Sequence, residues 1–301
     1  MYNFNSNEKI GLQRIVNDKN NINTLNNINK NNTNTLNNVI SKNKKNKKIN
    51  YKIKQAYGFI CLRKNKNTNK LQILLIKKQH TYAFSDFISG KYNKTNKEYL
   101  LKLFNQMSYN EKIVISSLKF NNIWYYFYHN NPENLYSNNN NQKWLNSYIK
   151  KKNKFDFTFI KDGGKYLKKL IENSKSCDPL WDLPKGKIEN NELPIDASIR
   201  ELQEETNIKL SSIKILFHLT PFIESYIDGG YIYRNTYYYT EVDPEWEPTN
   251  YFNLNNIENS DIKWIDTNEI DKLYSSNYIF KITNLKKSIK KYRQYKKKLY
   301  F

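Results

Sequence analysis

The residues with the clearest chemical potential lie in one stretch, residues 186–208. Gly186 is followed after five residues by Glu192, and seven residues later begins the run Arg200-Glu201-Leu202-Gln203-Glu204-Glu205. Because an α-helix turns by about 100° per residue, the three glutamates of that run share roughly a quarter to a third of a helix circumference. Stacked like charges destabilise a helix, and a bound divalent cation is the most economical reason to keep them together.

The opposite face of the same predicted helix is apolar and carries Ile195, Ile199 and Leu202, so it is expected to pack on a core. Oxygen ligands without clustered Cys or His select Mg²⁺ or Mn²⁺ over Zn²⁺. Such a cation polarises a bridging diphosphate and neutralises charge as water attacks phosphorus. One of the crowded carboxylates could act as a base, and the sequence does not say which. The alternative is an exposed, salt-bridged acidic helix.

The spacing in residues 186–208 resembles the Nudix box, Gx5Ex7REUxEExGU, in which U is an aliphatic residue. Every charged position is present, and the single departure is Asn207, where the family usually has glycine. Asn tolerates a left-handed backbone better than most residues, so the loop after the helix is expected to persist. The resemblance implies an α/β fold, the Nudix α/β/α sandwich on a mixed sheet, and a metal-dependent Nudix pyrophosphohydrolase.

The resemblance also implies roles for single residues. It assigns Glu201 and Glu205 to the metal, with Glu192, Glu204 and the Gly186 carbonyl in support, and it gives Arg200 the role of holding the carboxylates. Outside the box, Asp228 matches a metal-binding aspartate of viral relatives, although a plain turn residue is an equal alternative. Glu258 stands six residues before Trp264, where decapping enzymes carry a catalytic glutamate. The implied catalytic residues are therefore Glu201, Glu204, Glu258 and Arg200, and the implied metal ligands are Glu201, Glu205, Glu192, Gly186 and Asp228.

The residues before the box narrow the range of possible substrates. Trp181-Asp182-Leu183-Pro184-Lys185-Gly186-Lys187 resembles the W-x-x-P-K-G-K stretch of mRNA-decapping Nudix enzymes. The aromatic segment 81–92 and the long insertion after it resemble the decapping enzymes of large cytoplasmic DNA viruses. The resemblance implies hydrolysis of m7GpppN-RNA to m7GDP and 5′-monophosphate RNA, in the host cytoplasm for a viral enzyme. Lys185 and Lys187 stand next to the predicted metal site and could hold the triphosphate bridge.

Two other functions stay open. A Nudix hydrolase of diphosphoinositol polyphosphates or dinucleoside polyphosphates would need basic residues around its pocket but no extended RNA track. A cap-binding or RNA-binding protein with an inactive box is disfavoured, because every box carboxylate is intact.

Composition favours a polyanionic partner, here capped mRNA. The chain of 301 residues carries 50 basic and 28 acidic residues, a formal charge of +22. Enrichment in Asn, Lys, Ile, Tyr and Phe also fits an AT-biased coding sequence, which would account for part of the lysine excess. Two distant cysteines give no disulfide framework, and no apolar run approaches about 18 residues, so the sequence predicts a soluble, intracellular protein without membrane association.

The chain divides by composition into three parts. Residues 1–50 are a low-complexity basic tail predicted to be disordered, with a lysine run at Lys42–Lys48 that suits nucleic acid or a localisation signal. Residues 51–92 and 181–301 form the predicted Nudix domain. Residues 93–180 have helical periodicity and a capping-box pattern at Ser108 and Glu111. Their aromatic and basic side chains predict a helical insertion that binds RNA, with most of the aromatics around Trp124 taken as core.

Predicted elements surround the box. Strands are expected at 51–62 and 71–76, an aromatic loop at 81–92, a hairpin turning at Asp228-Gly229-Gly230, and a strand at 261–266. Gly58 in the first strand allows a close backbone approach. The tail 281–301 has nine basic residues and no acidic one, with Leu285, Ile289 and Tyr292 at helical spacing, and predicts a basic helix packed by its apolar stripe.

Overall fold

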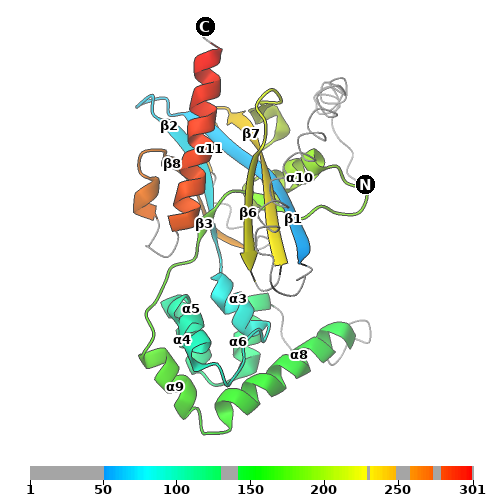
Figure 1. Ribbon diagram of the computed structural model, residues 1–301, viewed down its shortest axis with the longest axis vertical. Coiled ribbons are helices and arrows are strands. Elements are labelled where there is room, and N and C mark those ends of the chain that lie inside the picture. The colour runs from blue at the N-terminus through cyan, green and yellow to red at the C-terminus, as the bar shows by residue number, and fades with distance from the viewer. Residues whose placement is uncertain (1–50, 130–141, 229–230, 249–257, 274–278, 300–301) are drawn as a thin grey trace, which may run out of the picture. The chain divides into compact units, whose positions relative to one another are not determined.

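The structure is a computed structural model that describes residues 51–129, 142–228, 231–248, 258–273 and 279–299, with only the backbone of Asp228 (Figure 1). The predictions for residues 1–50, with Lys42–Lys48, and for turn residues 229–230 lie outside these ranges. By their internal contacts the residues form two units. The first comprises 1–75, 183–250 and 263–301, and the second comprises 76–182 and 251–262.

The first unit is built on a mixed β-sheet (Figure 1). Its central strands are β1 (Lys52–Lys64) and β7 (Tyr231–Val242), which run parallel to each other. Four further strands pair antiparallel with one of these two. β2 (Leu71–Lys78) and β4 (Lys185–Gly186) pair with β1. β5 (Ile213–Ile215) and β6 (Phe222–Asp228) pair with β7. β8 (Asn259–Asp266) pairs with β2, and short 3-10 turns lie at Leu210–Ser212 and Ile270–Leu273. The β6–β7 pair confirms the predicted hairpin.

Two helices, α10 (Pro194–Thr206) and α11 (Ile279–Lys298), cover opposite faces of this sheet. Side chains alternate along β7. The hydroxyl of Tyr239 donates to the Ser288 carbonyl of α11 at 3.0 Å. Tyr238 points the other way and packs on Phe59, and burial together with the charges of Tyr57 and Asp196 raises its pKa to about 12. Since Asp196 belongs to α10, the unit is the predicted α/β/α sandwich.

The C-terminal helix α11 confirms its prediction. Leu285, Ile289 and Tyr292 are buried along one stripe, while most of its lysines are exposed. None of the helices in the described ranges is both long enough and apolar enough to cross a lipid bilayer.

The second unit is mainly helical and contains the predicted insertion 93–180 together with 76–92, 181–182 and a short segment of β8. Its helices are α3 (Tyr82–Ile88), α4 (Lys97–Asn105), α5 (Tyr109–Ser116), α6 (Phe120–Tyr128), α8 (Gln142–Phe155), a π-helical turn at Asp156–Ile160, and α9 (Lys165–Glu172). The two-residue strand β3 (Trp181–Asp182) pairs with the end of β2. One aromatic core holds these helices together. Trp124 is fully buried there as predicted, whereas Tyr125 is 55% exposed.

The predicted loop at 81–92 was wrong, because residues 82–88 form α3. Thr81 caps this helix by accepting a hydrogen bond from the Phe84 N–H at 3.1 Å. The buried carboxylate of Glu111 in turn accepts hydrogen bonds from the N–H and hydroxyl of Thr81, both at 2.7 Å. Glu111 also completes the predicted capping box with Ser108. The stabilising partner of α3 therefore lies 30 residues away in sequence, beyond the reach of local pattern reading.

Gly58 is expected to be required for stability. A Cβ atom at this position would lie 2.0 Å from the Pro184 carbonyl oxygen and 2.6 Å from the Lys185 Cβ, so backbone would have to move. We expect Gly58→Ala to lower the free energy of unfolding by about 3 kcal/mol, the upper range of overpacking costs. Chemical denaturation measures this. Ala56→Gly in the same strand is the matched control, with an expected cost of about 1 kcal/mol. Equal stability of Gly58→Ala and wild type would contradict the packing described here.

Candidate active site

The helix that carries the box carboxylates is fixed at both ends by its sequence. Pro194 occupies the first turn of α10, where its missing N–H costs no hydrogen bond. The helix ends at Asn207, which adopts the left-handed conformation with φ 59°. Asn207 thus fills the place of the usual glycine. Ile195, Ile199 and Leu202 are buried on the inner face of the helix, as its apolar periodicity predicts.

Two carboxylates of α10 converge on the short strand β4. A Cβ atom on Gly186 would lie 1.9 Å from the carboxyl carbon of Glu201, so the carboxylate of Glu201 occupies the space that any larger residue would fill. The buried carboxylate of Glu205 accepts a hydrogen bond from the Lys185 N–H at 2.8 Å. Only glycine at position 186 leaves room for the Glu201 carboxylate. The spacing of the sequence indicates a glycine at this position but does not give this steric reason for it.

Arg200 lies among the remaining box carboxylates. Its guanidinium makes two hydrogen bonds to Glu192, of 2.9 and 3.1 Å, and donates to Glu201 at 2.8 Å. It also donates to Glu204 at 3.1 Å and to the Lys187 carbonyl at 2.9 Å. Such charge-assisted bonds fix the rotamers of the carboxylates. Arg200 thus ties the helix to the loop that precedes it.

The carboxylates differ in their proton affinity. Hydrogen bonding from Arg200 lowers the pKa of Glu192. Burial raises the pKa of Glu201 in spite of Arg200, and the charges of Glu205 and Glu204 raise it further. Burial and the charge of Glu192 also raise the pKa of Asp196. Burial thus disfavours the negative charge of Glu201, and an added cation would stabilise that charge.

The donors at this site fit a hard divalent cation. They are carboxylate oxygens of Glu201 and Glu205, with no thiolate or imidazole among them. Within the described ranges, no three His, Cys, Asp or Glu side chains are grouped as a complete set of metal ligands. The Arg200 guanidinium supplies the positive charge between Glu192, Glu201 and Glu204.

The other predicted site residues lie in different surroundings. The side chain of Glu204 is 59% exposed, so it lies at the rim of the carboxylate group. Lys185 is half-buried and Lys187 is exposed, one on each side of Gly186. Asp228 is the last residue of β6. Glu258 is exposed and belongs to the second unit, where its carbonyl accepts the Gln79 N–H at 2.8 Å.

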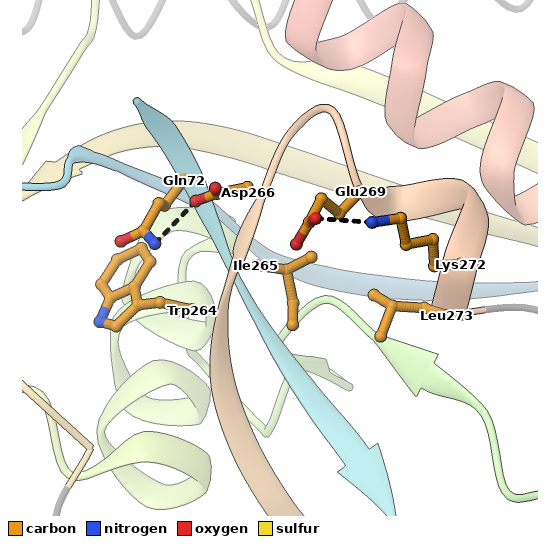
Figure 2. Close-up of a pocket in the computed structure, with 7 residues that line it drawn as sticks. All are labelled: Gln72, Trp264, Ile265, Asp266, Glu269, Lys272 and Leu273. Atoms are coloured by element: carbon orange, nitrogen blue, oxygen red, sulfur yellow. Dashed lines mark hydrogen bonds and ion pairs between the residues drawn. The ribbon is translucent and has the colours of Figure 1, made fainter. Parts of the chain in front are cut away.

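A surface pocket of about 310 Å³ lies away from the box residues, next to β8 (Figure 2). It is lined by Gln72, Trp264, Ile265, Asp266, Glu269, Lys272 and Leu273. The amide of Gln72 donates to Asp266 at 2.9 Å, and Lys272 pairs with Glu269 at 2.7 Å, as the dashed lines in Figure 2 show. Both carboxylates that line this pocket already have partners in Gln72 and Lys272, and none of the box residues lines it.

Comparison with known proteins agrees with the geometry. The model of the NUDIX domain matches residues 160–283. The mRNA-decapping protein g5R of African swine fever virus (isolate Pig/Kenya/KEN-50/1950) is 31% identical over 188 residues, which are 62% of this chain and 72% of that protein. The putative mRNA-decapping protein of Acanthamoeba polyphaga mimivirus is 26% identical over 245 residues, covering 76% of this chain and 63% of that protein.

Among solved structures, an Ap4A hydrolase of C. elegans in a binary complex is 13% identical and aligns with a TM-score of 0.39, covering 80% of this chain and 96% of that one. This likeness is too weak to carry an argument. The box geometry, the domain match and the identity to g5R together show that the chain belongs to the Nudix hydrolase family and is related to viral proteins named as mRNA-decapping proteins.

Proposed function

We propose that this protein is an mRNA-decapping enzyme that depends on a divalent metal ion and hydrolyses m7GpppN-RNA to m7GDP and 5′-monophosphate RNA. The observation that carries the proposal is the convergence of Glu201 and Glu205 on the Lys185-Gly186 strand. That strand is the P-K-G-K stretch that resembles decapping enzymes, and relatives named as decapping proteins support the choice. We place its action in the cytoplasm, where capped mRNA is exposed.

The chain's own residues suit each part of this reaction. Glu201, Glu205 and the Gly186 carbonyl would hold Mg²⁺ or Mn²⁺, which polarises a bridging phosphate and neutralises charge as water attacks. Lys185 and Lys187 flank Gly186 and would bind oxygens of the triphosphate bridge. Arg200 holds Glu192 and Glu201 in fixed rotamers through its hydrogen bonds.

The helical second unit is proposed to bind the RNA body. Phe157 is 53% exposed, and the ammonium nitrogens of Lys94 and Lys161 lie 3.6 and 5.2 Å from the centre of its ring. An exposed ring beside two cations can stack a base while the cations neutralise phosphates. Trp144 is a second exposed aromatic, at 47%, on the lysine-rich helix α8. These features support RNA binding by the insertion.

A comparison of substrates tests the proposed function. The full chain in Mg²⁺ or Mn²⁺ is expected to cleave capped RNA with a kcat/KM at least about tenfold above that for the free cap dinucleotide, since only RNA adds phosphate contacts. Preferred turnover of the dinucleotide, of Ap4A or of an inositol diphosphate would point instead to a hydrolase of small diphosphates. RNA binding without any turnover would contradict an enzymatic role altogether.

The exposed lysines of α11 are expected to contribute to RNA affinity. Lys287, Lys290, Lys297 and Lys298 are exposed. Replacing all four by glutamine should weaken RNA binding and reduce the slope of log affinity against log salt by up to about 3, because fewer counterions are released. Fluorescence anisotropy at several salt concentrations measures this slope. Lys272→Gln, which removes a lysine paired with Glu269, is the control. An unaltered slope in the fourfold variant would show that α11 is not on the RNA path.

A further inference from the structure

An arginine in the middle of the central sheet has no hydrogen-bond or ion-pair partner among the described residues. Arg234 lies in β7, between Gln55 of β1 and Ser225 of β6, so both edges of its strand are paired. Its side chain is half-buried, and within the described part of the chain it makes no hydrogen bond or ion pair. A partly buried cation that makes no hydrogen bond or ion pair with the described residues can accept an anionic ligand as its partner.

Arg234 faces the α10 side of the sheet. Side chains alternate along a strand, and Tyr238, four residues further along β7, packs on Phe59 on that side. An even separation places Arg234 on the same face as Tyr238. Tyr57 provides an independent sign, since burial raises the pKa of Tyr57 and the positive charge of Arg234 offsets part of that rise. Arg234 and Tyr57 are therefore neighbours on the face that α10 covers.

Tyr57 also links Arg234 to the box. Tyr57 and Gly186 are directly opposite each other in the β1–β4 pair, and the carboxylate of Glu201 lies against Gly186. Strands β4 and β7 lie on either side of β1, so they are two strand spacings apart. Along the strand direction, Arg234 is two residues away from the level of Gly186. With strands about 4.8 Å apart and a rise of about 3.3 Å per residue, the two Cα atoms are roughly 12 Å apart. A chain of linked phosphates that begins at Glu201 can reach an extended arginine side chain over this distance.

The surroundings of Arg234 suit an anionic ligand. Gln55 and Ser225, its direct neighbours on the adjoining strands, are uncharged and can donate hydrogen bonds. The next row of this face is apolar: Ile232 in its centre is buried, whereas Ile53 and Ile227 on either side are exposed. The planar guanidinium matches two phosphate oxygens at once.

We propose that Arg234 is a substrate-binding residue that binds a phosphate next to the one attacked. The site takes a chain of two or more linked phosphates and fixes its direction across the sheet. This inference rests on the proposed function only in that the substrate contains such a chain. Capped RNA and small dinucleoside polyphosphates both do.

Binding of inorganic tripolyphosphate tests the proposal on the full chain. By isothermal titration calorimetry in Mg²⁺, Arg234→Gln should raise the Kd at least about tenfold, the effect of losing a charged hydrogen-bonded contact. For capped RNA, the KM should rise by a similar factor while kcat changes less than about threefold, since the contact is made in both ground and transition states. Arg234→Lys should fall between wild type and Arg234→Gln, because lysine keeps the charge but not the planar fork.

Arg293→Gln is the matched control. Arg293 is exposed on α11, where it donates to Thr267 at 2.8 Å, and its loss should leave tripolyphosphate affinity unchanged. Wild-type affinity and KM in a folded Arg234→Gln variant would overturn the proposal, whether or not the enzyme removes caps. If Arg234→Gln does not fold, wild-type values in Arg234→Lys overturn it equally. Tripolyphosphate binding that depends on Arg234, without cleavage of capped RNA, would support this subsite and refute decapping.

Discussion

Glu201→Gln is expected to lower kcat for capped RNA by about a thousandfold, comparable with the loss of one preorganised electrostatic group from an active site, because Glu201 is proposed to hold the metal ion. Glutamine keeps the size of the side chain but not its charge, so the contact with Gly186 would persist while a bound cation would lose a charged ligand. RNA affinity, measured by anisotropy, should stay within about twofold of wild type, because phosphate contacts dominate it. Glu205→Gln should behave in the same way.

Glu204→Gln provides the matched control on the same helix. Its side chain is 59% exposed and reaches Arg200 at the rim of the group. Exposed ion pairs contribute little free energy, so the Glu204→Gln replacement should lower kcat by less than about tenfold. More than a tenth of wild-type kcat in Glu201→Gln would exclude the assignment of Glu201.

Gly186→Ala is expected to lower kcat about a hundredfold without unfolding the protein. The added Cβ would lie 1.9 Å from the Glu201 carboxyl carbon, and the flexible end of that side chain is what would move. Displacing a catalytic group by about 1 Å lowers the rate by roughly a hundredfold. Steady-state kinetics and thermal unfolding on the same sample separate a loss of kcat from a loss of stability.

Gly163→Ala controls for glycine replacement itself. Nothing lies within 4 Å of a Cβ there, and its φ of +70° is strained for alanine. It should cost about 1 kcal/mol of stability and leave kcat unchanged. A fully active Gly186→Ala would show that Glu201 works in another position than the one described here.

Much of the first unit could be predicted because its signals are local. The α10 helix follows from apolar periodicity and the fixed spacing of the box, and its end at Asn207 follows from the backbone that asparagine tolerates. The stripe of α11 and the β6–β7 hairpin are equally local. In contrast, the face of the sheet on which each side chain lies can be assigned only when the pairing register of the strands is known.

Features set by distant residues could not be predicted. Helix α3 depends on Glu111, which reaches Thr81 from another helix. Helical periodicity alone also does not distinguish the three box glutamates, whereas in the structure Glu205 is buried, Glu201 lies against Gly186 and Glu204 is exposed. Arg234 escaped notice in the sequence because its proximity to the box arises from two strand pairings.

The most direct test of the central claim is identification of the product released from cap-labelled RNA by the full chain, with and without Glu201→Gln. Our account predicts release of m7GDP that requires added Mg²⁺ or Mn²⁺, stops with EDTA and falls about a thousandfold in Glu201→Gln. Release of m7GMP, release that continues in EDTA, or equal release by Glu201→Gln would contradict it.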